Sequence, residues 1–255
     1  MTHPSSKLNK IIESDSILSI LDHVNEDTFV FSDLDNTLIE SENHLGSAQW
    51  GDYLYDLYFD PNRPVEDADS LEAEKWCEVQ PLINIRHVDP QTPELIRRLH
   101  ENKIPLIGLT ARRPEEIHFT LEQLNSLQIT LSRHFFNNDY LDDASQPRKR
   151  IIFHHGVIYC TPINQKSYGL KLFLEKAKCN PKKIIFIDDK LSHVEDVALF
   201  AKEQGIDYVG IRFSGADPRV KTFCPNIVKV QYEHLPKILS NDEAKFIFES
   251  KNNNK

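Results

Sequence analysis

Carboxylates and one hydroxyl stand at the ends of three short apolar runs in this sequence. The first run ends at Asp33 and Asp35, the second at Thr110, and the third at Asp188 and Asp189. If the three runs are strands of one parallel sheet, their carboxyl ends meet at one edge, which is where open α/β sheets bind ligands. One site would then gather up to four carboxylates and a hydroxyl.

Such a group of carboxylates needs a positive charge close by. Without one, mutual repulsion would make the carboxyl groups take up protons. Clustered carboxylate oxygens without cysteine or histidine suit a hard cation, and Mg²⁺ is the cation we expect. Bound there, Mg²⁺ would neutralise charge on a phosphate group.

The segments around these runs alternate between strand and helix patterns. Short apolar runs rich in β-branched and aromatic residues predict strands, and longer amphipathic segments predict helices. The predicted strands are Thr28–Asp33, Ile104–Thr110, Lys183–Asp188 and Tyr208–Ser214, and Ile151–Cys160 reads as strand material folded around Gly156. The predicted helices are Leu8–Val24, Thr92–Asn102, Pro114–Leu127, Lys166–Lys178, Leu191–Gln204 and Asn241–Ser250. The alternation is typical of an α/β protein with a mostly parallel sheet flanked by helices.

The pentapeptide Asp33-Leu-Asp-Asn-Thr matches the D-x-D-x-T signature of the haloacid dehalogenase (HAD) superfamily of phosphohydrolases. The other three motifs of that superfamily follow in order: Thr110 at a strand end, Lys166 at a helix start, and Asp188-Asp189 after an apolar strand. The chain therefore resembles this superfamily over about residues 27–214. Around Thr110 and Asp188 it resembles a poorly characterised bacterial branch, which brings no known substrate. The resemblance implies a Rossmann-like HAD core.

The resemblance also implies catalytic and phosphate-binding roles. Asp33 would be the nucleophile that forms an aspartyl-phosphate. Asp35 would protonate the leaving oxygen and then activate water. Thr110 would bind phosphate through its hydroxyl, together with its neighbours Ala111 and Arg112. For Arg112 a second interpretation, as a cap on the sheet edge, stays open.

The remaining roles concern charge. Lys166 would hold the phosphate and keep Asp33 ionised. The Mg²⁺ ligands would be Asp33, the backbone carbonyl of Asp35, and Asp188, with Asp189 close behind.

Lys171 is a rival to Lys166 for the lysine role. On the predicted helix Lys166 and Leu170 lie on one face, as residues i and i+4. Lys171 is turned about 100° away from Leu170, so we assign the role to Lys166. We interpret Asp196 as a charge on a helix face, and His193 as no direct ligand.

A segment rich in aromatic and acidic residues interrupts the alternation of strands and helices. It contains Trp50 and Trp76, and its pattern predicts two helices, Ser47–Phe59 and Val65–Val79. HAD proteins carry helical caps at this point, and such a cap excludes water and selects the leaving group. The predicted parts are a core of residues 1–40 and 92–240, a small helical cap insertion over 41–91, and a C-terminal helix and polar tail over 241–255.

The composition disfavours several classes of partner. The 255-residue chain has a formal net charge of −9, which disfavours binding to nucleic acid or to anionic membranes. The basic run Arg148-Lys149-Arg150 is interpreted as a solvated loop. The four cysteines form no C-x-x-C pair and are expected to be reduced. No signal peptide or membrane-spanning stretch is evident, so we expect a cytoplasmic protein. Export without a signal and the oligomeric state stay open.

The expected function is a Mg²⁺-dependent, HAD-type phosphatase acting on a small phosphorylated substrate. A phosphotransferase with the same residues and a catalytically silent binding module remain alternatives. A dehalogenase is disfavoured, because displacing halide leaves Asp35 without a role. An ATP-driven ion pump would need membrane helices.

Overall fold

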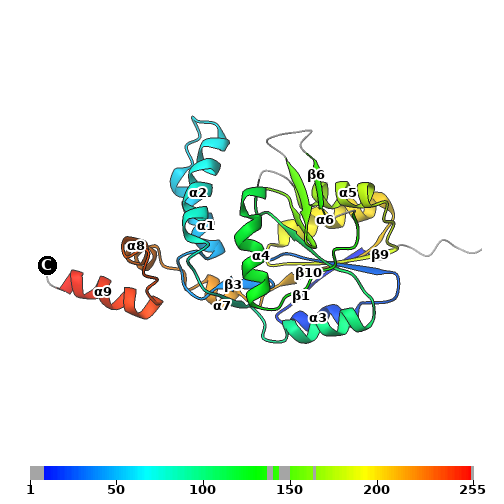
Figure 1. The fold of residues 1–255 in the computed structure, drawn as a ribbon, viewed down its shortest axis with the longest axis horizontal. Coiled ribbons are helices and arrows are strands. Elements are labelled where there is room, and N and C mark those ends of the chain that lie inside the picture. The colour runs from blue at the N-terminus through cyan, green and yellow to red at the C-terminus, as the bar shows by residue number, and fades with distance from the viewer. Residues whose placement is uncertain (1–8, 137–139, 144–149, 163–164, 254–255) are drawn as a thin grey trace, which may run out of the picture. The chain divides into compact units, whose positions relative to one another are not determined.

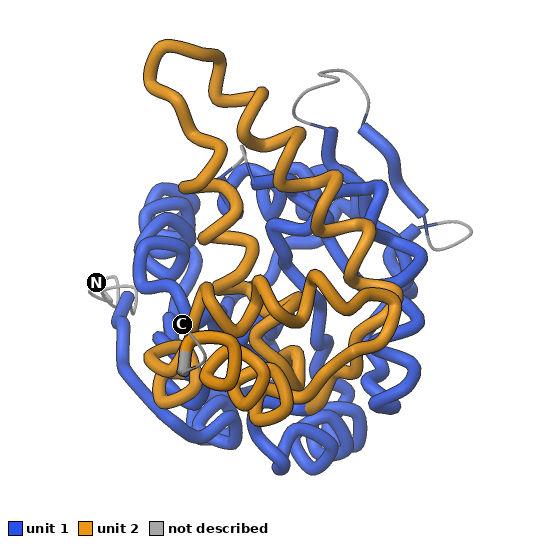
Figure 2. Tube along the Cα trace, turned by 90° about the vertical axis from the view of Figure 1, so that its left-hand side faces the viewer, with its two compact units in different colours: residues 1–38, 87–216 blue, residues 39–86, 217–255 orange. Residues whose placement is uncertain are grey.

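The computed structural model describes residues 9–253 except for 137–139, 144–149 and 163–164 (Figure 1). Arg148 and Lys149 of the basic run therefore lie outside the described residues. The chain divides into two compact units. Unit 1 holds residues 1–38 and 87–216, and unit 2 holds residues 39–86 and 217–255 (Figure 2).

Unit 1 is built on an eight-stranded sheet of order β1-β10-β9-β2-β5-β8-β7-β6. The strands are β1 (Asn9–Ser14), β2 (Thr28–Ser32), β5 (Leu106–Thr110), β6 (Tyr140–Asp143), β7 (Ile151–His154), β8 (Val157–Tyr159), β9 (Lys183–Asp188) and β10 (Asp207–Phe213). In the order of the sheet, neighbouring strands from β1 as far as β8 pair in parallel. Strands β7 and β6 then pair antiparallel at the edge. The predicted mostly parallel sheet is confirmed.

The central strands are buried almost throughout. All five residues of β5 and five of the six in β9 are buried. Strands covered on both faces read as continuous apolar runs rather than as an alternation, which is why these segments could be recognised in the sequence. Their order places the carboxyl ends of β2, β5 and β9 side by side.

Helices cover both faces of this sheet. The helices of unit 1 are α3 (Thr92–Glu101), α4 (Ile117–Ser126), α5 (Lys166–Ala177) and α6 (Leu191–Gln204), with the 3-10 helices η1 (Ile17–Asp22) and η2 (Pro114–Glu116). Figure 1 shows α5 and α6 on one face and α3 on the other. Phe31 of β2, Phe173 of α5 and Phe186 of β9 belong to one buried cluster beneath α5 and α6. The predicted α/β architecture is therefore confirmed.

The predicted helix over Leu8–Val24 is wrong. In its place β1 pairs in parallel with β10, and η1 follows after a short turn. The Ser16 side chain accepts a hydrogen bond from Leu18 N at 3.3 Å and caps η1, whose Ile17 and Ile20 are buried. The apolar residues that suggested one helix are thus divided between two elements, because pairing with the sheet edge satisfies the backbone of β1.

Unit 2 is mainly helical. Its helices are α1 (Ala48–Tyr58), α2 (Val65–Val79), α7 (Asp217–Val220), α8 (Pro225–Glu233) and α9 (Asn241–Asn253), and β3 (Ile39–Ser41) pairs with β4 (Ile85–His87). The two predicted helices of the aromatic segment are confirmed. Trp50 of α1 and Trp76 of α2 stack with ring centroids 6.1 Å apart, so the two tryptophans form part of the core of this unit.

The structure divides the chain differently from the predicted boundaries. We expected the core to continue to residue 240, but residues 217–255 are grouped with 39–86. The side chain of Gln231 in α8 explains this, because it accepts a hydrogen bond from Leu45 N at 3.0 Å and donates to Leu239 O at 2.9 Å. Arg219 Nε also lies 2.6 Å from Glu40. The contacts of Gln231 with Leu45 and of Arg219 with Glu40 join segments far apart in sequence and leave no local pattern.

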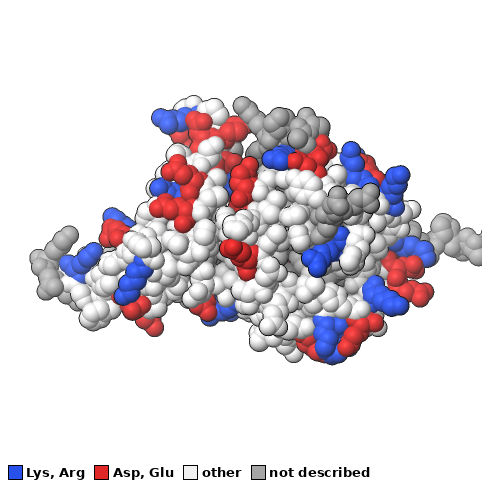
Figure 3. Space-filling view, in the orientation of Figure 1, with Lys and Arg blue, Asp and Glu red and all other residues white. Residues whose placement is uncertain are grey.

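Negative charge is concentrated in the first segment of unit 2. Residues 39–86 contain eleven acidic and three basic residues, so this segment carries most of the net charge of −9. Acidic side chains gather over α1 and α2 in the space-filling view (Figure 3). The remainder of the chain, which includes the predicted site, is close to neutral. Among the described helices, none has the length and apolar character needed to cross a membrane.

Candidate active site

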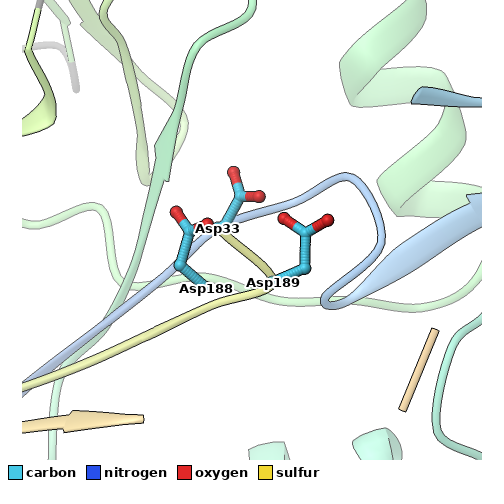
Figure 4. Close-up of side chains that lie close together, drawn as sticks. All are labelled: Asp33, Asp188 and Asp189. Atoms are coloured by element: carbon cyan, nitrogen blue, oxygen red, sulfur yellow. The ribbon is translucent and has the colours of Figure 1, made fainter. Parts of the chain in front are cut away.

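The carboxyl ends of β2 and β9 bring three aspartates together. The backbone N–H of Asp33 donates to Ile187 O at 2.9 Å, which holds the end of β2 against β9. Asp33, Asp188 and Asp189 each offer a carboxylate oxygen within 4.8 Å of the others, and their carboxyl groups point to the same side (Figure 4). Asp33 and Asp188 are buried, at 6% and 0% exposure. This is the convergence that the strand ends predicted.

A backbone turn after β2 directs the following residues toward β9. Asn36 has a φ of 59°, a left-handed conformation that Asn tolerates better than most residues. Its side-chain Nδ2 donates to Asp189 Oδ2 at 3.1 Å. The sequence indicated a turn at this residue, but it gave no signal for the contact with Asp189.

Lys166 is the basic group in contact with this cluster. It is the first residue of α5 and is 2% exposed, and its Nζ lies 2.6 Å from both Asp33 Oδ1 and Asp188 Oδ2. The side chain of Lys171 is 53% exposed and pairs with Glu175 at 3.9 Å. The helix-face argument predicted which lysine turns inward. Its role toward phosphate stays a prediction.

Asp196 holds the helix that carries Lys166. The N-cap residue of α5, Gln165, makes no side-chain cap, and Asp196 of α6 supplies one instead. Asp196 Oδ2 accepts from Ser167 N at 2.8 Å, and Oδ1 accepts from Ser167 Oγ at 2.7 Å. Asp196 therefore satisfies one of the N–H groups that a helix start leaves without partners, and it also holds the Ser167 hydroxyl. It was interpreted as a charge on a helix face, and no local pattern revealed this contact.

Close packing also fixes α5. A Cβ at Gly169 would lie 2.3 Å from Cys160 Sγ, just beyond the end of β8. Only glycine allows the helix to approach the sheet this closely, and the approach brings the first turn of α5 to the strand ends.

Burial and charge set the protonation of the three carboxyl groups. Burial raises the pKa of Asp33 to about 6 against the opposing charge of Lys166. Burial would also raise the pKa of Asp188, but the charges of Lys166 and His193 hold it at about 2. Burial, followed by the charges of Asp33 and Asp188, raises the pKa of Asp189 to about 8. The field at the site therefore stays negative despite the lysine.

These residues fit a hard divalent cation. Asp33, Asp188 and Asp189 offer oxygen ligands only, as Mg²⁺ prefers. The raised pKa of Asp189 indicates that further positive charge would be favourable there. His193 Nδ1 lies 3.1 Å from both Asp188 oxygens, so it contacts a candidate ligand rather than completing the cluster.

Thr110 and Arg112 follow β5, the strand beside β2. Thr110 is buried and its Oγ1 accepts from Arg112 N at 3.1 Å, and Ala111 lies half-buried between them. Arg112 is also buried. Its Nε and Nη2 each lie 2.8 Å from one carboxylate oxygen of Asp35. The predictions for Arg112 were a phosphate clamp or a cap on the sheet edge, and neither anticipated this pairing.

The fold and the site define a class: an α/β protein with an acidic cluster and a buried lysine at the carboxyl edge of a mostly parallel sheet. The chain belongs to the family described as "Protein of unknown function (DUF2608)", whose family model matches residues 7–245.

The similarity to two relatives spans most of the chain. A protein of Chlamydia pneumoniae named "Putative outer membrane protein" is 26% identical over 223 residues, which cover 86% of this chain and 81% of the relative. A protein of Chlamydia muridarum with the same name is 27% identical over 220 residues, which cover 86% of this chain and 82% of the relative.

Two solved structures show a distant likeness. A haloacid dehalogenase-like family hydrolase from Streptococcus pneumoniae is 14% identical, with a TM-score of 0.44 and coverage of 73% of this chain and 95% of that one. A hydrolase from Pseudomonas syringae is 14% identical, with a TM-score of 0.39 and coverage of 76% and 98%. The likeness is too distant to carry an argument about activity.

Proposed function

We propose that this protein is a Mg²⁺-dependent phosphatase that hydrolyses a small phosphorylated substrate through an aspartyl-phosphate on Asp33. The observation that carries the proposal is the Lys166 ammonium, which lies 2.6 Å from both Asp33 and Asp188 beside Asp189. The resemblance of the four motifs to HAD phosphohydrolases supports the same assignment.

The first step transfers the phosphoryl group to the enzyme. An oxygen of Asp33 attacks phosphorus, and the bond from phosphorus to the ester oxygen breaks. The leaving oxygen takes a proton from Asp35. Lys166 keeps Asp33 ionised in the free enzyme and offers positive charge to the phosphate oxygens. Thr110, at the end of the neighbouring strand, would donate its hydroxyl hydrogen to the phosphate.

The second step releases inorganic phosphate. Water attacks phosphorus, its proton goes to Asp35, and the bond between phosphorus and the Asp33 oxygen breaks. Mg²⁺, held by Asp33, the Asp35 carbonyl and Asp188 with Asp189 close behind, would supply charge neutralisation for the phosphoryl oxygens when bound.

The test is a screen of purified protein over a panel of phosphate esters, with and without Mg²⁺. We expect turnover that needs Mg²⁺, stops in excess chelator, and is lost in Asp33→Asn. Asp15→Asn, at an exposed aspartate of unit 1, is the matched control and should keep full activity. Absence of turnover on every ester, or equal turnover by Asp33→Asn, would refute the proposal and favour a silent binding module. Transfer to an added alcohol in preference to water would indicate a phosphotransferase.

The proposal does not depend on the compartment in which the protein resides. The outer-membrane names belong to the relatives, and a cytoplasmic location stays a prediction that cell fractionation would test. The absence of nucleic-acid and membrane partners likewise stays a prediction.

A further inference from the structure

The side chain of Asp35 is held by an arginine in two places at once. Arg112 Nε lies 2.8 Å from Asp35 Oδ2, and Arg112 Nη2 lies 2.8 Å from Asp35 Oδ1. A guanidinium that meets a carboxylate with two parallel hydrogen bonds fixes both the position and the plane of that carboxylate. The side chain of Arg112 is 4% exposed and that of Asp35 is 23% exposed, so Asp35 keeps partial access to solvent while Arg112 has almost none.

Arg112 is itself anchored from α4. Its Nη1 donates to Thr120 Oγ1 at 2.9 Å and to Gln123 Oε1 at 2.8 Å. Thr120 is held in turn, because its hydroxyl donates to Glu116 O at 2.7 Å. The three guanidinium nitrogens of Arg112 are therefore all engaged by protein groups.

We propose that Arg112 is a positioning residue that orients Asp35 for proton transfer, and that it does not bind the substrate phosphate. This inference rests on the proposed function. A carboxylate has about four acceptor sites on its two oxygens, and the two hydrogen bonds from Arg112 occupy two of them. The remaining sites would be left for the leaving oxygen and later for the attacking water.

The orientation matters most in the second step. As the oxygen of water bonds to phosphorus and the Asp33 oxygen leaves, one proton of that water passes to Asp35. A carboxylate free to rotate would spend part of its time with its acceptor sites turned away from the water. The pair with Arg112 removes this freedom before the reaction begins. Thr120 and Gln123 of α4 hold Arg112 in turn, so the orientation of Asp35 also depends on α4.

The two possible roles of Arg112 predict different kinetics. A phosphate-binding arginine contributes to substrate binding, so its loss raises KM and weakens inhibition by inorganic phosphate. An arginine that orients Asp35 contributes to proton transfer, so its loss lowers kcat and leaves KM and phosphate inhibition unchanged. An aryl phosphate, whose leaving group needs no proton, isolates the second step. An alkyl phosphate needs Asp35 in both steps.

The experiment measures kcat, KM and inhibition by inorganic phosphate for wild type, Arg112→Met, Arg112→Lys, Asp35→Asn and the double variant Arg112→Met/Asp35→Asn. General acid–base catalysis contributes about 10²–10⁴-fold, and we expect Arg112→Met to lose about 10–100-fold of kcat on the alkyl ester. Arg112→Lys keeps the charge but not the two-pronged geometry, so it should recover only part of this loss. In the Asp35→Asn background, Arg112→Met should change kcat by less than about twofold.

Two further variants protect the test against a folding defect. Gln123→Leu removes one anchor of Arg112 and should lower kcat in the same direction by less. Arg113→Lys is the matched control, because Arg113 is the neighbouring buried arginine but pairs with Glu116, at 3.1 Å, rather than with Asp35. It should leave kcat within about twofold of wild type.

A rise in KM with weakened phosphate inhibition in Arg112→Met would overturn the inference and assign Arg112 to phosphate. Full activity in Arg112→Lys would overturn the inference as well. So would an equal loss of kcat when Arg112→Met is introduced into wild type and into Asp35→Asn. If wild type itself turns over no ester, the proposed function fails and this inference fails with it. An active wild type with unchanged kcat in Arg112→Met overturns this inference alone.

Discussion

Replacing Asp189 by Asn should stabilise the metal-free protein at high pH and weaken its response to Mg²⁺. Burial, with the charges of Asp33 and Asp188, raises the pKa of Asp189 from 3.8 to about 8. The folded state therefore binds a proton that the unfolded state has released, so stability falls as pH rises through that window. Asparagine carries no charge, and its side-chain oxygen can still accept the hydrogen bond from Asn36.

The magnitude follows from the size of the shift. One pKa unit corresponds to about 1.4 kcal/mol, so a rise of about four units sets an upper limit of roughly 5 kcal/mol at pH 8. The three carboxylates titrate together, and protonation of one relieves the others. We therefore expect Asp189→Asn to gain about 2–3 kcal/mol at pH 8 in chelator and close to nothing at pH 4.

The assay is urea denaturation of wild type and Asp189→Asn at pH 4 and pH 8, in chelator and in Mg²⁺. Wild type should gain stability from Mg²⁺, by about 2.7 kcal/mol at a concentration 100 times Kd, and the variant should gain less. Asp15→Asn, which removes an exposed carboxylate, should behave as wild type. A variant less stable than wild type at pH 8 in chelator, or one with the same pH dependence, would refute the reasoning.

Three other predictions concern substitutions at the site. Lys166→Ala should abolish measurable turnover and Lys171→Ala should keep most of it, because of these two lysines only Lys166 is buried against Asp33. Steady-state kinetics that show the reverse order would contradict the assignment of Lys166. Asp196→Ala removes a helix cap from α5 that is worth about 0.5–2 kcal/mol. Denaturant unfolding should show a fall in the free energy of unfolding of that size. An unchanged free energy of unfolding would mean that the cap is dispensable. Asp35→Asn should form the phosphoenzyme from an aryl phosphate and accumulate it, whereas Asp33→Asn should form none. Acid quenching with radiolabelled substrate distinguishes the two variants. Label retained on Asp33→Asn would overturn the assignment of Asp33 as the nucleophile.

Local pattern predicted the central strands and several helices. Strands β2, β5 and β9 were recognised as short continuous apolar runs, and helices α1, α2 and α6 by the helical period of their apolar residues. Segment 9–22 was predicted wrongly, since its apolar residues suit a helix locally while the edge of β10 offers a partner for a strand. Sheet pairing between residues about 200 positions apart leaves no trace in a short window.

The candidate site shows the same division. Asp33 and Asp188 were named from strand ends. Lys166 was named from the resemblance to the HAD motifs, and the helix face decided between it and Lys171. The structure brings Asp33, Asp188 and Lys166 together. The pairing of Arg112 with Asp35 and the cap from Asp196 to Ser167 were not foreseen. Each of these contacts joins residues that lie 29 or more positions apart, so their partners depend on how the elements pack.

The sequence by itself determined the fold class, the strands that carry the chemistry, and the residue types that stand at their ends. It could do so because a period of apolar residues and a polar group at the end of a strand are properties of a few consecutive positions. Only the tertiary structure decided which carboxylate the buried arginine holds, which acid caps the lysine helix, and that residues 217–255 join residues 39–86. Those outcomes follow from side-chain contacts between distant segments, and such contacts form only when the whole chain has packed.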